Sequence, residues 1–131
     1  ISKYDIVMDA TDNLHARYLI NDACVKLGKP FVYGSICEFC GQVSVFNYQN
    51  GPTYRDLFEY NDEIENFSQP LGVIGALPGI VGSLQANEAI KIILEKPGVL
   101  SGKLLTIDIL NNTYLTFAIR KKERGEESLF K

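Results

Sequence analysis

The spacing of apolar residues along this chain changes between that of a strand and that of a helix. The first such change predicts a strand, a turn and a helix. Residues 4–10, YDIVMDA, form a short apolar run that suits a buried parallel strand. Thr11-Asp12-Asn13 is rich in residues that cap helix N-termini, so a helix is expected to follow and to end near Gly28. Within that stretch apolar residues recur at helical spacing, at Ala16, Ile20, Ala23 and Leu27.

A second and a third strand are expected after this helix. Residues 31–34 follow Pro30 and a short turn, so the first strand, the helix and this strand form a βαβ unit, for which a right-handed crossover is expected. Residues 41–48, GQVSVFNY, alternate less regularly and predict a half-exposed strand that runs antiparallel to its neighbour. The sheet is therefore expected to be mixed.

The second half of the chain predicts another helix and a hairpin. Pro78 favours a helix start and Pro97-Gly98 a helix end, and the residues between them are apolar on nearly every side. Such a helix is expected to be buried in a core or in a subunit interface. Residues 103–110 and 114–120 are β-rich runs separated by Asn111-Asn112-Thr113, which suits a tight turn. The expected fold class is α/β, a mixed parallel and antiparallel sheet with helices packed on it.

Two segments lack a regular period. Residues 48–72 include an acidic stretch and predict a long exposed loop, which in a compact domain is either functional or poorly ordered. The charged tail at 121–131 is expected to be frayed or to act as a linker.

Composition places the chain among single soluble domains. It has 131 residues, of which 46% are hydrophobic and 22% charged, enough apolar material for a real core. The net charge of −3 gives no general attraction for nucleic acid or an anionic membrane. No apolar run is long enough to span a bilayer and no signal peptide is visible, so a cytoplasmic location is expected. Because the sequence starts at Ile1 and almost at once in a strand, we expect a fragment of a longer chain.

Three cysteines are too few and too unevenly spaced for a disulfide framework, and reduced thiols are expected. Cys37 and Cys40 form a C-x-x-C, but a zinc site needs two more ligands at useful spacing. Small buried thiols are the favoured interpretation. A thiol redox protein is the alternative, and it requires an accessible pair with a lowered pKa.

Four segments in order resemble the ThiF/MoeB/HesA family of the ubiquitin-activating-enzyme superfamily. The first contains D-x-T-D-N, followed by Arg17 and Asn21. The third contains G-x-x-G-x-L-P-G-x-x-G-S-x-Q-A-x-E-A-I-K, and the combination of the two motifs is highly specific. The four segments are residues 4–35, 41–58, 72–94 and 102–121.

The resemblance implies a Rossmann-like ATP-binding domain of roughly twice this length, whose glycine-rich turn lies before Ile1. Residues 1–120 would be its C-terminal part. Family members use ATP and Mg²⁺ to adenylate the C-terminal glycine of a ubiquitin-like sulfur-carrier protein, ThiS-like for thiamin or MoaD-like for molybdopterin, and normally work as homodimers. The fragment alone is expected to be inactive. The alternative is a non-catalytic member that has kept the scaffold as a protein-binding or dimerisation module.

The motif supplies the candidate site residues. Asp12 matches the family's aspartate that handles Mg²⁺ and the ATP phosphates, since carboxylate oxygens suit this ion, although Asp12 also suits a helix cap. Asn13, Arg17 and Asn21 are implied to line the nucleotide and carrier-tail region. The alternative is that these three form a structural hydrogen-bond network between helix and strand ends. Asp9 is expected to fix the strand terminus.

The chain departs from the family pattern at two places. Many members carry a C-x-x-C of a structural zinc site after the G-P turn, where this chain has Thr53 and Asp56, so zinc is not expected. The loop at 59–71 matches the family's crossover loop, in which many relatives carry a cysteine for a covalent step. Ser68 stands about there, and a serine without a nearby base is a poor nucleophile. No covalent step through this position is expected.

Overall fold

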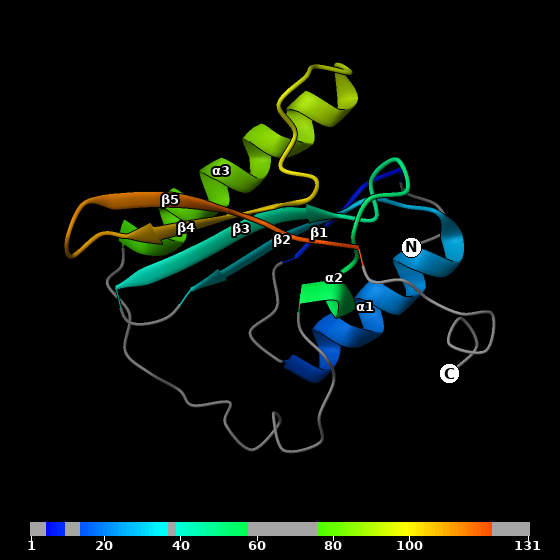
Figure 1. Cartoon of the computed structure of the whole chain (residues 1–131), viewed down its shortest axis with the longest axis horizontal. Helices are drawn as coiled ribbons and strands as arrows, with labels where there is room; N and C mark the ends of the chain where they lie inside the picture. The colour runs from blue at the N-terminus through cyan, green and yellow to red at the C-terminus, as the bar shows by residue number, and fades with distance from the viewer. Residues whose placement is uncertain (1–4, 10–13, 37–38, 58–75, 122–131) are drawn as a thin grey trace.

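A five-stranded mixed sheet forms the centre of the protein, in the order β1-β2-β3-β4-β5 (Figure 1). The computed structural model describes residues 5–9, 14–36, 39–57 and 76–121. The elements are β1 (Val7–Met8), α1 (Leu14–Leu27), β2 (Phe31–Ile36), β3 (Cys40–Phe46), α2 (Tyr54–Leu57), α3 (Ala76–Ile93), β4 (Lys103–Asp108) and β5 (Thr113–Ala118).

The strand directions confirm the predicted βαβ unit and the mixed sheet. β1 pairs with β2 in parallel, and α1 connects the two. The pairs β2–β3, β3–β4 and β4–β5 are all antiparallel. The predicted hairpin is also present, and Asn112 in its turn has a φ of 54°, the left-handed conformation that asparagine accepts more readily than most residues.

Helices cover both faces of the sheet. α3 lies on one face, and α1 with α2 lies on the other (Figure 1). Each layer has its own core cluster. On the α1 side the buried residues are Tyr18, Cys24, Phe31, Tyr33, Phe46, Tyr54, Leu104 and Ile119. On the α3 side they are Val43, Leu77, Val81 and Ile107.

The buried face of α1 differs from the predicted apolar stripe. Leu27 is exposed, and Ala16, Ile20 and Ala23 are only partly buried. Arg17, Tyr18, Asn21 and Cys24 face the sheet instead. The apolar spacing misled the sequence prediction because two polar side chains on this helix find partners inside the protein.

β3 ends earlier than expected, and a short helix follows it. Asn47 leaves the strand with a φ of 57°, and its Nδ2 donates to the carbonyls of Cys24 and Lys29, each at 3.0 Å. These bonds fasten the turn to the end of α1. Residues 54–57 then form α2 inside a segment that the sequence predicted as loop. The predicted crossover loop at 59–71 lies outside the described residues.

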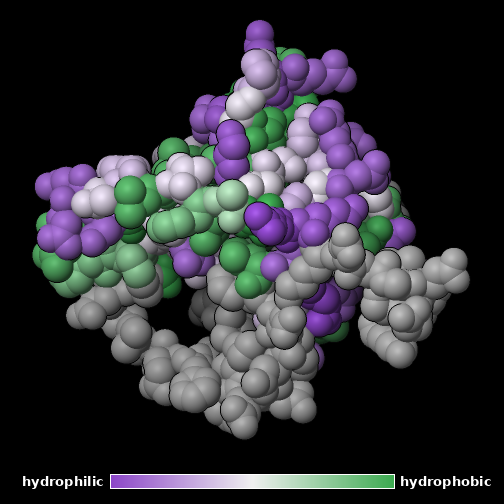
Figure 2. All heavy atoms as spheres, viewed as in Figure 1, coloured by the Kyte–Doolittle hydropathy of each residue, from purple (hydrophilic) through white to green (hydrophobic). Residues whose placement is uncertain are grey.

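α3 is less buried than its composition predicts. Leu77 and Val81 pack on the sheet, whereas Ile90 and Ile93 toward the other end are exposed. β5 is exposed along most of its length, and apolar side chains gather on the surface over β4 and β5 (Figure 2). An exposed apolar surface of this kind is typical of a site that binds another molecule. Among the described helices, none combines the length and apolarity that crossing a membrane requires.

The cysteine prediction is correct at one position and wrong at another. Cys24 is a free, fully buried thiol, as predicted. Cys40, at the start of β3, is disulfide-bonded, which contradicts the expected reduced state. Cys37 lies outside the described residues.

Cys24 is expected to resist alkylation in the folded protein. Burial raises the pKa of its thiol to about 11, so the thiol stays protonated at pH 8, and only the thiolate reacts. Labelling with iodoacetamide at pH 8 followed by peptide mass analysis should show Cys24 unmodified until urea unfolds the chain. Modification at the rate of an exposed thiol without denaturant would contradict this placement.

Candidate functional site

The carboxyl end of β1 is held at Asp9, the residue immediately before residues 10–13. Its backbone N–H donates to the Val32 carbonyl at 2.8 Å. Its carboxylate accepts a bond from Arg17 Nε at 2.8 Å, and its backbone carbonyl accepts one from Gln85 Nε2 at 2.9 Å. The expectation that Asp9 fixes the strand terminus is confirmed.

Arg17 links α1 to the ends of β1 and β2. Besides the Asp9 carboxylate, its guanidinium donates to the Gly34 carbonyl at 3.3 Å and to Ser35 Oγ at 3.4 Å. It also lies 5.5 Å from the centre of the Tyr33 ring. The Arg17 side chain is 8% exposed and the Asp9 side chain 0%. Each of the two charges therefore stabilises the other in the folded protein, because a buried charge without a partner is strongly unfavourable.

Tyr33 completes this polar cluster beneath the guanidinium. Its hydroxyl donates to Gln42 Oε1 on β3 at 3.0 Å. Burial raises the pKa of Tyr33, and the neighbouring Arg17 charge opposes that shift only in part. The phenol therefore stays protonated at neutral pH and serves as a hydrogen-bond donor.

The structure describes two of the four candidate site residues, Arg17 and Asn21. Asp12 and Asn13 lie outside the described residues. Arg17 lies at the carboxyl ends of the parallel strands, where open α/β sheets place their ligands. Asn21, one turn further along α1, is buried, and its Oδ1 accepts a bond from the Tyr54 N–H at 3.0 Å. It joins α1 to the first turn of α2.

Sequence reasoning assigned no role to Gln85, Ser35 or Tyr33. Gln85 stands in the Q-A-x-E-A-I-K part of the recognised motif, which was the available signal. Its contact with Asp9 joins residues that are 76 positions apart, and sequence spacing does not reveal such a contact.

Thr53 and Asp56 bond to each other at the start of α2. Asp56 Oδ2 accepts bonds from the Thr53 N–H at 2.7 Å and from Thr53 Oγ1 at 3.3 Å. In a capping box, the side chain of the third helical residue accepts a hydrogen bond from the backbone N–H of the capping residue. The bond from the Thr53 N–H to Asp56 is of this kind. Among the described residues, no group of three or more His, Cys, Asp and Glu side chains is arranged to hold a metal ion. The absence of zinc stays a prediction.

Removing this cap is expected to destabilise the protein. We expect Asp56→Ala to cost about 0.5–2 kcal/mol, the usual effect of losing a helix cap. Asp56→Asn keeps an oxygen acceptor and should cost less. Urea unfolding followed by circular dichroism measures both variants. An Asp56→Ala protein as stable as the wild type would show that the bond to Thr53 has no net effect.

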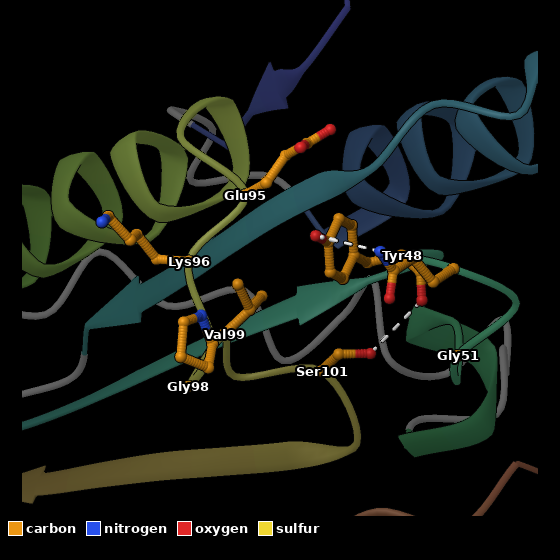
Figure 3. Close-up of a pocket in the computed structure, with 9 residues that line it drawn as sticks. Tyr48, Gly51, Glu95, Lys96, Gly98, Val99 and Ser101 are labelled. Atoms are coloured by element: carbon orange, nitrogen blue, oxygen red, sulfur yellow. Dashed lines mark hydrogen bonds between the residues drawn. The ribbon is translucent and has the colours of Figure 1, made fainter.

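A cavity of about 710 Å³ lies at the opposite end of the strands (Figure 3). It is formed by the turn after β3 and the connection from α3 to β4. Ser101 Oγ donates to the Tyr48 carbonyl at 3.4 Å, and the Tyr48 hydroxyl accepts a bond from Gln49 Nε2 at 3.3 Å. The Lys96 side chain points away from both (Figure 3). Of the candidate site residues that the structure describes, neither Arg17 nor Asn21 lines this cavity.

A known protein family matches nearly the whole chain, including both sequence motifs. The ThiF family matches residues 1–128. The chain belongs to the ThiF family. This result confirms the resemblance found in the sequence.

Curated proteins similar to this ThiF-family chain are adenylyltransferases by name. The probable molybdopterin-synthase adenylyltransferase of Pyropia yezoensis is 48% identical over 122 residues, covering 91% of this chain and 32% of the relative. The adenylyltransferase and sulfurtransferase MOCS3 of Dictyostelium discoideum is 48% identical over 128 residues, covering 95% and 30%. The chain thus spans about a third of the length of these relatives.

Solved structures confirm the predicted fold class. A crystal structure of E. coli MccB with ATP has a TM-score of 0.75 and 14% identity, over 93% of this chain and 38% of MccB. MccB in complex with N-formylated MccA gives the same TM-score and identity. At this level of identity the likeness shows the fold alone.

Proposed function

We propose that this chain is part of an ATP-dependent adenylyltransferase that activates the C-terminal glycine of a ubiquitin-like sulfur-carrier protein. One observation supports the proposal most directly. Asp9 is fixed by three hydrogen bonds at the carboxyl end of β1, where such sheets bind ligands, and it is the first residue of the D-A-T-D-N motif. The names of the similar curated proteins agree with this chemistry.

The proposed reaction is an acyl adenylation. A carboxylate oxygen of the carrier's terminal glycine attacks the α-phosphorus of ATP. A new oxygen–phosphorus bond forms, the bond to the β-phosphate oxygen breaks, and pyrophosphate leaves with that electron pair. Asp12 would hold Mg²⁺, which when bound neutralises phosphate charge. The glycine-rich turn that binds the phosphates would lie in the longer protein.

Arg17 and Asn21 are proposed to hold the scaffold around Asp12. Arg17 braces the ends of β1 and β2 through the buried pair with Asp9. Asn21 secures α2 against α1 through its bond to Tyr54. Asn13 is proposed to contact nucleotide or carrier beside Asp12. In this arrangement α1 positions the site and the residues before it carry the chemistry.

Exposed apolar surfaces support the binding of protein partners. Leu115 and Phe117 on β5 are each 52% exposed, and Ile93 on α3 is 67% exposed. We propose that a MoaD-like carrier and a second copy of the protein use such surfaces. The molybdopterin names of the relatives favour a MoaD-like carrier over a ThiS-like one. We also propose that the protein acts in the cytoplasm.

The proposal is tested with the full-length protein, ATP, Mg²⁺ and labelled pyrophosphate. Exchange of label into ATP should require a carrier that ends in glycine and should disappear when the terminal glycine is deleted. A MoaD-like carrier should support faster exchange than a ThiS-like carrier. Tight carrier binding without exchange would contradict the proposal and favour the alternative, a non-catalytic protein-binding module.

A further inference from the structure

A series of hydrogen bonds leads from the buried guanidinium of Arg17 to Gln42 on β3. Arg17 Nη1 donates to Ser35 Oγ at 3.4 Å, and the Tyr33 hydroxyl donates to Gln42 Oε1 at 3.0 Å. Ser35 joins these two bonds, because its side chain also hydrogen-bonds to the Tyr33 hydroxyl. The four side chains therefore form one connected network.

The direction of this network is set by Arg17, because a guanidinium only donates hydrogen bonds. Ser35 Oγ must accept from it, and the single hydroxyl proton of Ser35 is left for Tyr33. Tyr33 in turn gives its own proton to Gln42 Oε1. The phenol keeps that proton at neutral pH, because burial raises the pKa of Tyr33. The amide of Gln42 thus has a fixed orientation, with its oxygen toward Tyr33.

The two N–H groups of Gln42 Nε2 are the open end of the network. No residue that the structure describes accepts a bond from them, and the Gln42 side chain is partly exposed. Thr106 lies opposite Gln42 on β4 and faces the same side of the sheet. Its hydroxyl already donates to the Leu115 carbonyl at 3.2 Å. Gln42 therefore keeps donors for another molecule, whereas Thr106 does not.

Gln42 lies between the end of β1 and the exposed apolar residues of β5. On one side of it, Ser35 on β2 is its partner in the strand register and contacts Arg17. On the other side, Leu115 on β5 follows Thr106 in the same row across the sheet and is 52% exposed. A partner that covers Leu115 and extends toward β1 therefore passes over Gln42.

We propose that Gln42 is a specificity-determining residue that binds a main-chain carbonyl oxygen in the C-terminal tail of the carrier. A tail that ends in glycine has no side chain there to be recognised, so its carbonyl oxygens are the acceptors that it presents. The oriented N–H groups of Gln42 suit such an oxygen. The inference rests on the proposed function for the identity of this partner.

Three variants of the full-length protein test the role of these donors. Gln42→Glu keeps the size and an acceptor for Tyr33, but it removes both N–H groups. Gln42→Met removes them without adding a charge and serves as the second donor-free variant. Thr106→Val is the matched control, because it changes the next residue of the row, whose proton is already used within the sheet. Circular dichroism identifies the variants that are fully folded.

The measurement is the Kd of a MoaD-like carrier by calorimetry, with the intact carrier and with a carrier that lacks its terminal glycines. We expect both Gln42 variants to bind the intact carrier roughly 5- to 100-fold more weakly, the effect of leaving an acceptor without its donor. Thr106→Val should bind it as the wild type does. The truncated carrier should bind all four proteins equally. Equal weakening for both carriers, or no weakening for either, would overturn the inference.

Pyrophosphate exchange separates a failure of this inference from a failure of the proposed function. We expect the Gln42 variants to raise the KM of the carrier and to leave the KM of ATP unchanged. A wild-type protein that binds the carrier without exchange would refute adenylation, and the Kd values would still decide the role of Gln42. A wild-type protein that binds no glycine-ended carrier would overturn both.

Discussion

Replacing Arg17 with methionine is expected to lower the free energy of unfolding by about 3–5 kcal/mol, the effect of breaking a buried ion pair from one side. The Asp9 carboxylate, with 0% of its side chain exposed, would lose its 2.8 Å contact with the guanidinium. The carbonyl of Gly34 and the hydroxyl of Ser35 would lose a donor as well. Urea unfolding measures the change.

A second ion pair, between Asp22 on α1 and Arg55 on α2, provides the control. Arg55 Nε lies 2.8 Å from Asp22, but their side chains are 40% and 48% exposed. Arg55→Met should therefore cost no more than about 1 kcal/mol, because solvent screens exposed pairs. The double variant Asp9→Asn with Arg17→Met should recover part of the loss. Equal losses for Arg17→Met and Arg55→Met would show that burial does not set the strength of the Asp9 pair.

Asp12→Asn is expected to reduce carrier-dependent pyrophosphate exchange of the full-length protein roughly 100- to 1,000-fold, the effect of removing one group that stabilises a transition state. The amide keeps the shape and the capacity to cap α1, so stability should change little. It removes the negative charge that the proposed role requires.

Asp5→Asn is the matched control for this experiment. Asp5 lies just before β1 and is exposed, so its replacement should leave both stability and exchange unchanged. If Asp12→Asn also exchanged at the wild-type rate, Asp12 would be only a helix cap. Asp12 would also be only structural if the activity of Asp12→Asn fell in proportion to the fraction of folded protein.

Periodicity predicted much of the fold because the strands and helices bury apolar residues at regular spacing. The βαβ unit, the hairpin and the helix after Pro78 all appear near their predicted positions. The errors have identifiable causes. β3 stops at Phe46 because Asn47 turns to fasten the end of α1. α2 was missed because four residues are too few to show a helical period.

The buried face of α1 could not be predicted from apolar spacing. Arg17 and Asn21 occupy positions that face the sheet, and their burial depends on partners in β1, β2 and α2. Those partners are distant in sequence. The contact of Gln85 with Asp9 could not be predicted for the same reason. It also depends on Gly34, because a side chain at that position would clash with Gln85.

Family resemblance, in contrast, supplied the chemistry that periodicity cannot provide. The D-A-T-D-N motif identified Asp12 as the candidate for catalysis, and nothing in the described residues tests that role. The structure adds the physical context, a strand end held from both faces of the sheet. Two helices, α1 and α3, hold this strand end through Arg17 and Gln85.

Mapping where ATP binds tests this placement of the site most directly. Amide hydrogen exchange of the full-length protein, with and without ATP and Mg²⁺, would be compared between the two ends of the strands. The account predicts slower exchange at residues 9–17 and no change at residues 48–51 and 95–101, the two segments that contain the residues lining the cavity. Protection of the cavity segments, with residues 9–17 unchanged, would contradict it.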